Sequence, residues 1–363
     1  MSNIRDVAKE AGVSTATVSR TFTSPQHGHT QTQKKVLEAA RRLGYRPRQD
    51  QRSRRSGQDD LPANVSFSRP GLRDIIGFQF LAAGPNDSIS SNAFYGPILL
   101  GAEKEASALG LHMLVNTTDR HAFALEVPSM VKEQMINGML LVGSAESDDF
   151  STIARHVPNL VLVDNPDETH RYEAIISDGF SGAYEATQYL LDLGHGDNTV
   201  FLTAQRKSKT FQERLRGYIC ALFENGITAD SGKVVRVPPG RDDQSEQKAA
   251  ITAMLQSPNR PTAIICANDY LALKVMQTCW SLGVRIPDDL SVIGFDDVEF
   301  SRQAWPPLTT VRVDKELMGR LAVRRLYARL QQGSSPANWQ PVGPHIVPVS
   351  LVIRDSCAPF VKG

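Results

Sequence analysis

The feature that most constrains the fold is the long stretch after Asp74, where short apolar runs alternate with amphipathic segments. The runs have strand length, and the segments between them repeat apolar residues at helical spacing. Parallel strands need helical crossovers and are apolar on both faces, because helices cover both sides of such a sheet. The alternation therefore predicts an α/β fold built from parallel sheets. The predicted strands are Ile75–Leu81, Leu111–Asn116, Gly138–Val142, Leu160–Val163, Ala174–Ile176, Thr199–Leu202, Val234–Val237, Ala263–Cys266, Leu290–Phe295 and Val347–Ile353.

These strand–helix units are too numerous for one sheet, and the pattern restarts near residue 196. We predict two doubly wound parallel α/β subdomains, one from residues 74–178 plus 297–330 and the other from residues 179–296 plus 331–363. Ligands of such sheets bind beyond the carboxyl ends of the strands. At these ends the sequence places Asp119, Asp164, Asn268-Asp269 and Asp296-Asp297. Helix capping would explain any one of them, but the whole set favours a ligand site between the subdomains.

The first 47 residues differ from this pattern and predict a small all-α head. Four apolar residues share one face of a first helix, and Gly12 follows where a left-handed residue can end it. Ser14 can then cap a second helix, and a third helix is expected over Thr32–Leu43. Two short helices joined by a turn that contains Gly are typical of a helix-turn-helix, whose second helix enters the DNA major groove. The first face consists of Ile4, Val7, Ala8 and Ala11.

Charge favours DNA binding over the alternative of three arbitrary helices at the edge of a larger domain. Residues 1–60 contain 12 Lys and Arg against 6 Asp and Glu, whereas the remainder contains 28 against 33. The near-neutral total therefore hides a basic head on an acidic body, as expected of a protein that binds phosphates. Residues 48–73 have little to bury and predict a basic linker. Its arginines, among them Arg52, Arg54 and Arg55, can contact phosphates or the minor groove.

Composition and motifs exclude several other classes of protein. No apolar run reaches the length of a membrane span or a signal sequence, so we expect a cytoplasmic protein without membrane contact. The four cysteines are scattered, which predicts reduced thiols rather than disulfides or a zinc site. Gly226–Lys233 is similar to a phosphate loop but is one residue too long, and Val234 stands where Ser or Thr would hold magnesium. We therefore predict no enzyme, no metal and no cofactor.

Both parts of the chain resemble the lactose/galactose-repressor (LacI/GalR) family of transcriptional regulators. In the head, the similar segments are Asp6–Ser14, Thr17–Arg20 and Gly44–Pro47. In the core, Asn92–Tyr95, Gly101–Glu103, Ile136–Leu141, Arg214–Tyr218, Ala267–Asp269, Ile286–Asp297 and Pro307–Val311 match in order and spacing. The resemblance implies a helix-turn-helix head (residues 1–47), a hinge or linker (48–73) and a periplasmic-binding-protein-like type I core (74–363) that binds an effector and dimerises. Within the family, the chain is most similar to the cytidine repressor branch.

The resemblance also implies roles for individual residues. Thr15, Ala16 and Arg20 would face base edges of a palindromic operator in double-stranded DNA, whereas Ser14, Thr17, Ser19 and Tyr45 would mainly contact phosphates. Arg214, Asn268 and Asp296 occupy effector-contact positions, and Asp164 and Thr210 complete this set. Phe94 or Tyr95 would stack on the ligand. An arginine, an amide and a carboxylate beside an aromatic wall suit a sugar or a nucleoside. The implied function is ligand-controlled repression by a homodimer, and Gly101–Glu103 belongs to its first dimer helix.

The sequence departs from the family in its linker and at its end. Residues 48–55 contain no Leu to wedge into the minor groove, so we hypothesise a looser coupling between effector and DNA. No heptad tail follows Ile353, which favours a dimer over a tetramer. Two alternatives share the core fold, namely a solute-binding receptor and a sugar-processing enzyme. The DNA-binding head argues against the receptor, and the missing catalytic residues argue against the enzyme.

Overall fold

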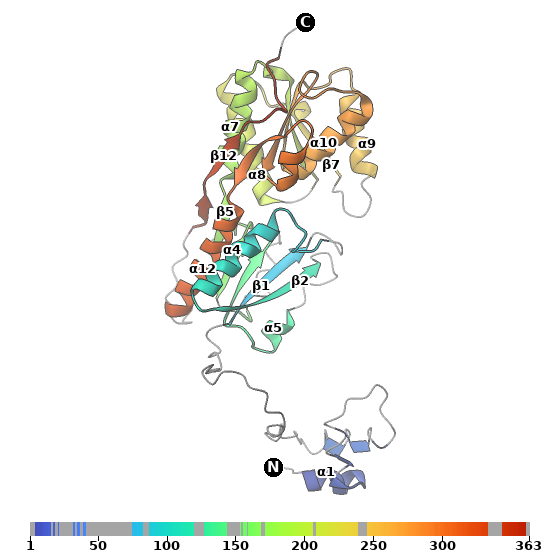
Figure 1. The fold of residues 1–363 in the computed structure, drawn as a ribbon, viewed down its shortest axis with the longest axis vertical. Coiled ribbons are helices and arrows are strands. Elements are labelled where there is room, and N and C mark those ends of the chain that lie inside the picture. Colours follow the sequence, from blue (N-terminus) through green and yellow to red (C-terminus); the bar gives the residue numbers. More distant parts are fainter. Residues whose placement is uncertain are drawn as a thin grey trace, which may run out of the picture. The chain divides into compact units, whose positions relative to one another are not determined.

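The structure is a computed structural model of the 363-residue chain, which divides into two compact units, Met1–Ser68 and Arg69–Gly363 (Figure 1). The boundary between the units falls within the predicted linker. The described residues are 4–15, 17–18, 21, 32, 35–36, 39–40, 75–82, 87–119, 127–143, 153, 155–157, 159–167, 171–205, 208–238, 245–332 and 343–360.

In the first unit, helix α1 (Ile4–Ala11) ends as the sequence predicts. Gly12 has a φ of +63°, and the next backbone N–H, of Val13, donates to Ala8 O at 3.0 Å. Ser14 caps the following helical segment, because its Oγ accepts a hydrogen bond from Thr17 N at 3.2 Å. The helix end and the cap are thus confirmed. One apolar cluster joins α1 to the later segments of the head; it contains Val7, Ala8, Val18, Val36, Ala39 and Ala40.

The second unit contains two lobes, each built on a six-stranded sheet. In the first lobe the strand order is β11-β5-β4-β3-β1-β2, and every neighbouring pair is parallel. Its strands are β1 (Ile75–Ala82), β2 (His112–Asp119), β3 (Gly138–Val142), β4 (Leu160–Val163), β5 (Glu173–Ser177) and β11 (His345–Val347). Alternate residues of β3 enter two different apolar clusters: one lies under α4 (Tyr95–Ala108) and α12 (Lys315–Gln332), the other under α5 (Ser129–Lys132). Helices therefore cover both faces.

The second lobe has the strand order β12-β10-β9-β8-β6-β7, in which only β10 and β12 are antiparallel. Its strands are β6 (Thr199–Ala204), β7 (Val234–Val237), β8 (Ala263–Cys266), β9 (Ser291–Asp296), β10 (Thr309–Val313) and β12 (Val349–Val352). Its helical elements are α7 (Gly179–Asp192), η2 (Gly196–Asn198), α8 (Lys209–Glu224), η3 (Ser231–Lys233), α9 (Ser245–Leu255), α10 (Asp269–Leu282) and α11 (Glu299–Gln303). The predicted α/β class and two-sheet architecture are confirmed.

The chain crosses between the lobes three times, after β5, after β10 and between β11 and β12 (Figure 1). This corrects the predicted subdomain limits. Residues 297–313 belong to the second lobe, since β10 pairs with β9, and β11 places residues 345–347 in the first lobe. Neither strand could be recognised in the sequence, because β10 contains two threonines and an exposed arginine and β11 is only three residues long. The crossings are themselves joined, since Asp178 N donates to Val347 O at 2.9 Å.

Candidate functional site: residues between the two lobes of the core

A buried ion pair lies where β9 of the second lobe ends. Arg214 of α8 is 2% exposed and Asp296 is 6% exposed, and Arg214 Nη2 lies 3.0 Å from Asp296 Oδ1. The guanidinium lies over the ring of Phe295 at 3.8 Å, and its Nη1 donates to Ala267 O at 2.5 Å. Among the described residues, Arg214 Nε has no hydrogen-bond partner. The strand end thus holds a neutralised charge pair with hydrogen-bonding capacity left over.

Opposing effects of burial and nearby charges determine the pKa of the Asp296 carboxylate. Burial raises its pKa to about 6, although the positive charges of Arg214 and Lys315 act in the opposite direction. The negative charge of Asp164 raises the pKa of Asp296 further. Asp164 follows β4 of the first lobe, so this charge effect on Asp296 comes from the other lobe.

The first lobe contributes a tyrosine and a carboxylate. Tyr95 begins α4, and its hydroxyl donates to Asp164 Oδ2 at 2.8 Å. The ring of Tyr95 lies 5.1 Å from that of Phe80 and 5.0 Å, edge-on, from that of Phe94. Asp164 has a φ of +59°, a backbone conformation that non-glycine residues rarely adopt and that often occurs at functional sites. We call Tyr95, Asp164, Arg214 and Asp296 the interlobe cluster.

Two further residues of the predicted effector set have local roles. Asn268 caps α10, because its Oδ1 accepts from Leu271 N at 3.1 Å. Thr210 lies in the first turn of α8, with its Oγ1 3.0 Å from Ser208 Oγ. Both residues are half-buried. Helix capping accounts for the contact of Asn268, whereas Thr210 contacts the side chain of Ser208, the residue that caps α8. Their place in an effector site stays a prediction.

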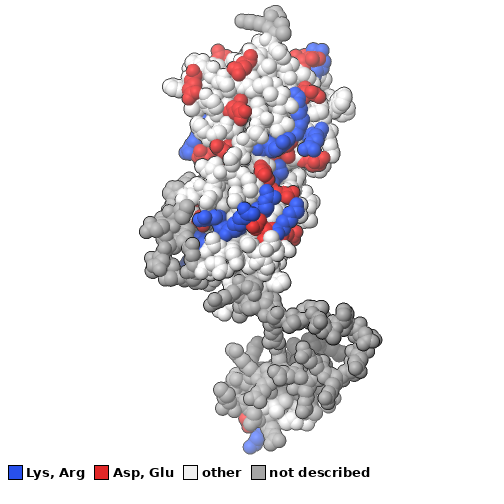
Figure 2. All heavy atoms as spheres, turned by 60° about the vertical axis from the view of Figure 1, so that its left-hand side comes forward, with Lys and Arg blue, Asp and Glu red and all other residues white. Residues whose placement is uncertain are grey.

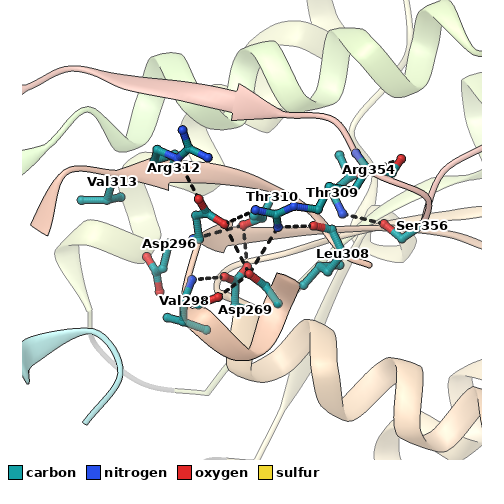
Figure 3. Close-up of polar contacts among 12 residues, drawn as sticks. Asp269, Asp296, Val298, Leu308, Thr309, Thr310, Arg312, Val313, Arg354 and Ser356 are labelled. Atoms are coloured by element: carbon teal, nitrogen blue, oxygen red, sulfur yellow. Dashed lines mark hydrogen bonds and ion pairs between the residues drawn. The ribbon is translucent and has the colours of Figure 1, made fainter. Parts of the chain in front are cut away.

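The other strand-end aspartates of this lobe are structural. Asp269 is fully buried; its Oδ1 accepts from Thr310 Oγ1 at 2.5 Å and its Oδ2 from Val298 N at 2.8 Å (Figure 3). Asp297 accepts hydrogen bonds from Arg312 Nε at 2.7 Å and Arg354 Nη2 at 2.5 Å. Asp297 therefore ties β10 to the segment that follows β12.

One residue near the cluster could not be identified from the sequence. Lys315, the first residue of α12, donates to the backbone oxygen of Asp296 at 2.5 Å, of Asp297 at 3.1 Å and of Val313 at 3.2 Å. Burial lowers its pKa, while the charges of Asp296 and Asp297 raise it. A lysine at a helix start is typical of a solvated face. The three backbone oxygens that surround Lys315 come together only when the chain folds, so the sequence alone does not identify it.

In the head, three of the predicted DNA contacts lie within the described residues. Ser14 and Thr15 are exposed, and Thr17 is half-buried with its Oγ1 2.9 Å from Ser14 Oγ. These hydroxyls lie at the start of the predicted recognition helix. The other predicted contacts lie outside the described residues; they are Ala16, Ser19, Arg20, Tyr45, Arg52, Arg54 and Arg55.

The charged surface of the core does not resemble a phosphate-binding patch on the face shown in Figure 2. Basic side chains there lie beside acidic ones. The core contains surface ion pairs of this kind, such as Lys104–Glu316 and Arg324–Glu105. Within the part of the chain that the structure describes, no three His, Cys, Asp or Glu residues are grouped to hold a metal ion. In that same part, none of the helices combines the length and apolar character of a membrane span. The four cysteines are free thiols, as predicted.

Two family patterns match the chain. The pattern of bacterial regulatory proteins of the lacI family matches residues 3–48, and that of a periplasmic binding protein-like domain matches residues 187–357. A curated relative, the HTH-type transcriptional repressor PurR of Vibrio cholerae serotype O1 (strain M66-2), is 30% identical over 351 residues. This match covers 96% of the present chain and 97% of PurR.

Solved structures share the fold over nearly the whole chain. The transcriptional regulator CelR in complex with cellobiose has 25% identity and a TM-score of 0.66, and the match covers 98% of this chain and 100% of that one. The lac repressor dimer bound to operator and the anti-inducer ONPF has 26% identity and a TM-score of 0.64, with coverages of 98% and 99%. All three similar proteins are transcriptional regulators rather than enzymes.

Proposed function

The chain belongs to the LacI family of bacterial regulatory proteins, and we propose that a neutral, hydroxyl-rich effector bound at the interlobe cluster controls its operator affinity. As a member of this family it is a DNA-binding transcriptional repressor with a small-molecule effector domain. The effector class that we propose is a sugar or a nucleoside. Binding of the effector relieves repression by shifting the population between DNA-binding and non-binding arrangements.

The observation that supports this effector class is the buried Arg214–Asp296 pair. An arginine that already contacts a carboxylate and a carbonyl has no unbalanced charge to attract a phosphate or a carboxylate ligand. Within the described residues, Arg214 Nε and Asp296 Oδ1 both have no hydrogen-bond partner, although Oδ1 is in the ion pair. A hydroxyl group can accept from the first and donate to the second. The ring of Tyr95, whose hydroxyl donates to Asp164 of the same cluster, offers a flat apolar surface for a sugar or base.

The comparisons support the same class. The CelR structure contains cellobiose, which is a neutral sugar rich in hydroxyl groups. Nucleosides share this hydroxyl chemistry through their ribose, and they add a base that can stack on Tyr95 or Phe94. The role proposed for Asn268 is carried over from the family resemblance. Asp164 is proposed because it lies at the end of a strand, and Thr210 as a member of the predicted effector set.

We also propose that the chain binds a palindromic operator as a homodimer, because a two-fold protein matches two half-sites. Large apolar side chains are exposed on the second lobe, and a second copy of the chain would cover them. Trp280 of α10 is 86% exposed, Phe300 of α11 is 59% exposed, and Trp305 is 94% exposed. Exposed apolar residues of this size often mark protein–protein contacts. In the first lobe, α4 adds Leu100, which is 43% exposed.

A thermal-shift comparison of D-ribose, cellobiose and cytidine with D-ribose 5-phosphate tests the effector class. A ligand at 100 times its Kd stabilises the folded chain by about 2.7 kcal/mol, and the neutral compounds should include one that does so. Arg214→Ala should abolish this increase in Tm. Arg216→Ala, which removes an exposed arginine of the same helix, should preserve it. An increase caused only by the phosphate, or one that survives Arg214→Ala, would contradict the proposed site.

The predicted recognition helix can be tested with DNA duplexes that the full chain selects from a random pool. Arg20→Ala should weaken binding to the selected duplex by roughly 10-fold or more, since a bidentate arginine–guanine contact contributes about 1–3 kcal/mol. Lys9→Ala removes the same charge from the exposed face of α1 and should weaken selected and unrelated duplexes equally. Unchanged affinity of Arg20→Ala at moderate salt would refute the groove assignment.

A further inference from the structure

We propose that Lys315 is a positioning residue that couples the Asp296–Asp297 turn of the second lobe to helices α12 and α4 of the first. The proposal rests on the effector site proposed above, because Asp296 is the carboxylate whose state Lys315 would transmit. It concerns how occupancy of that site reaches the rest of the molecule. Three observations carry it: the conformation of the turn, the bonds of the ammonium group, and the packing of the two helices.

The Asp296–Asp297 turn has a backbone conformation that needs support from outside. Asp296 has a φ of +119° and Asp297 a φ of +49°, in a region that residues with a Cβ rarely adopt. Such conformations persist only where the surrounding structure imposes them. The backbone oxygens of both residues accept hydrogen bonds from Lys315 Nζ. The lysine therefore binds the turn at the two residues that are strained.

The bonds of Lys315 use its full donor capacity. An ammonium group has three N–H donors, and Lys315 Nζ contacts three backbone oxygens, at 2.5 Å on Asp296, 3.1 Å on Asp297 and 3.2 Å on Val313. Its charge also acts on the Asp296 carboxylate, whose pKa it lowers against the effect of burial. A change in the charge of that carboxylate, or in its partners, therefore changes the force on Lys315.

Helix α12 passes any displacement to α4, because the two backbones are in direct contact. A Cβ added at Gly101 of α4 would lie 2.1 Å from Glu316 O, and one added at Gly319 would lie 2.0 Å from Ile98 O. Glu316 is the residue after Lys315, and its side chain pairs with Lys104 of α4 at 2.8 Å. Helices packed this closely move together, since interiors at this density do not deform by one residue at a time. Helix α4 begins with Tyr95 of the interlobe cluster and is the predicted dimer helix.

A double-mutant cycle read by hydrogen–deuterium exchange tests the coupling on the full chain without ligand or DNA. Asp296→Asn removes the charge that Lys315 faces and should accelerate exchange of the α4 backbone amides by about threefold or more. In a Lys315→Met background the same Asp296→Asn change should have no effect on α4. Lys315→Arg keeps the charge and several donors, so it should restore the response.

A lysine that only caps carbonyls would give a different result. Lys315→Met would then accelerate exchange locally, and its effect would add to that of Asp296→Asn in α4 as elsewhere, which would overturn the proposal. Lys315→Gln, which keeps a donor but not the charge, replaces Lys315→Met in the cycle if the methionine variant fails to fold. If no neutral compound raised the Tm in the thermal-shift comparison, the proposed effector site would be wrong, but this double-mutant cycle could still be interpreted. An additive cycle beside a successful screen would sink only the role of Lys315.

Discussion

Asp296 and Asp297 are neighbours in the chain and both have a positive φ, yet their carboxylates have opposite surroundings. Asp297 accepts hydrogen bonds from two arginines, whereas the Asp296 carboxylate pairs with one, Arg214, and feels the charge of Lys315. Burial raises the pKa of Asp297, but the two arginines outweigh it and lower the pKa overall. At Asp296 burial dominates and raises the pKa to about 6. The number of donors, and not the position in the chain, separates a structural carboxylate from one that is available to a ligand.

The contrast follows from what each side chain joins. Asp297 connects Arg312 on β10 with Arg354 beyond β12, and Arg354 also donates to Leu308 O at 2.7 Å (Figure 3). These bonds hold the antiparallel edge of the second sheet together. Asp296 pairs with Arg214 of its own lobe, and the charge of Asp164 from the other lobe acts on its carboxylate. A fully bonded carboxylate stabilises one arrangement, whereas an incompletely bonded one can respond to a ligand.

Two isosteric substitutions, Asp297→Asn and Asp296→Asn, should give the largest difference in the free energy of unfolding between the two residues. Asp297→Asn leaves two arginines with a neutral partner and should reduce the free energy of unfolding by about 3 kcal/mol or more, as when a buried ion pair loses one member. Asp296→Asn has two opposed effects at pH 7.5, because it removes a carboxylate whose ionisation burial disfavours but leaves the buried Arg214 without its partner. Its loss of unfolding free energy should therefore be clearly smaller than that of Asp297→Asn. Urea denaturation of the full chain measures both. Equal losses would end the distinction between the two residues.

The pH dependence of stability provides a second, smaller effect. Burial raises the pKa of Asp269 to about 7, and the charge of Asp296 adds to this increase. The unfolded chain therefore ionises at this residue first, near its usual pKa of 3.8. As a result, the free energy of unfolding should fall as pH rises from about 4 to about 7, by up to roughly 1.4 kcal/mol per pH unit per group.

Asp269→Asn should remove a large part of this fall, and Asp296→Asn should remove the part below about pH 6. Asp297→Asn should instead remove a contribution to stability that increases with pH. Because the pKa of Asp297 is lowered, its ionised form stabilises the fold above pH 3.8 and loses this contribution as pH falls. Urea denaturation at a series of pH values distinguishes these signs. A wild-type stability that rises steadily from pH 4 to pH 7 would contradict the assignment of Asp269 as a raised-pKa group.

The periodicity of the sequence was sufficient to predict much of the fold. Two predominantly parallel α/β sheets and the capped start of the second head helix follow from local patterns of residues. The assignment of β10 to the second sheet does not follow, because Thr309–Val313 lacks the apolar run of a central strand. Its place depends on pairing with β9 and β12, which no local pattern encodes.

The site residues divide in the same way. Arg214 and Asp296 could be predicted as a pair because both lie in motifs that resemble a known family, and the structure brings them into contact. Asp269 could not be separated from Asn268 in the sequence, since both follow β8. Its burial depends on Thr310, 41 residues later, which folding brings to it. Lys315 was missed for a similar reason, because its acceptors lie on a turn and a strand that precede its helix.

Thr310→Val gives the smallest effect and tests whether Asp269, although both of its oxygens accept hydrogen bonds, still changes its ionisation state near pH 7. Thr310 Oγ1 donates to Asp269 Oδ1 at 2.5 Å, and this bond lowers the pKa of Asp269 against the effect of burial. Hydrogen bonds to an ionised acceptor are stronger than those to a neutral one. Thr310→Val should therefore reduce the free energy of unfolding by about 1 kcal/mol more at pH 8 than at pH 5. Thr278→Val, which removes a bond to the uncharged Lys274 O, should cost the same at both pH values. If the cost of Thr310→Val were equally independent of pH, Asp269 would keep one ionisation state throughout, and a raised pKa would distinguish Asp296 alone from its structural neighbours.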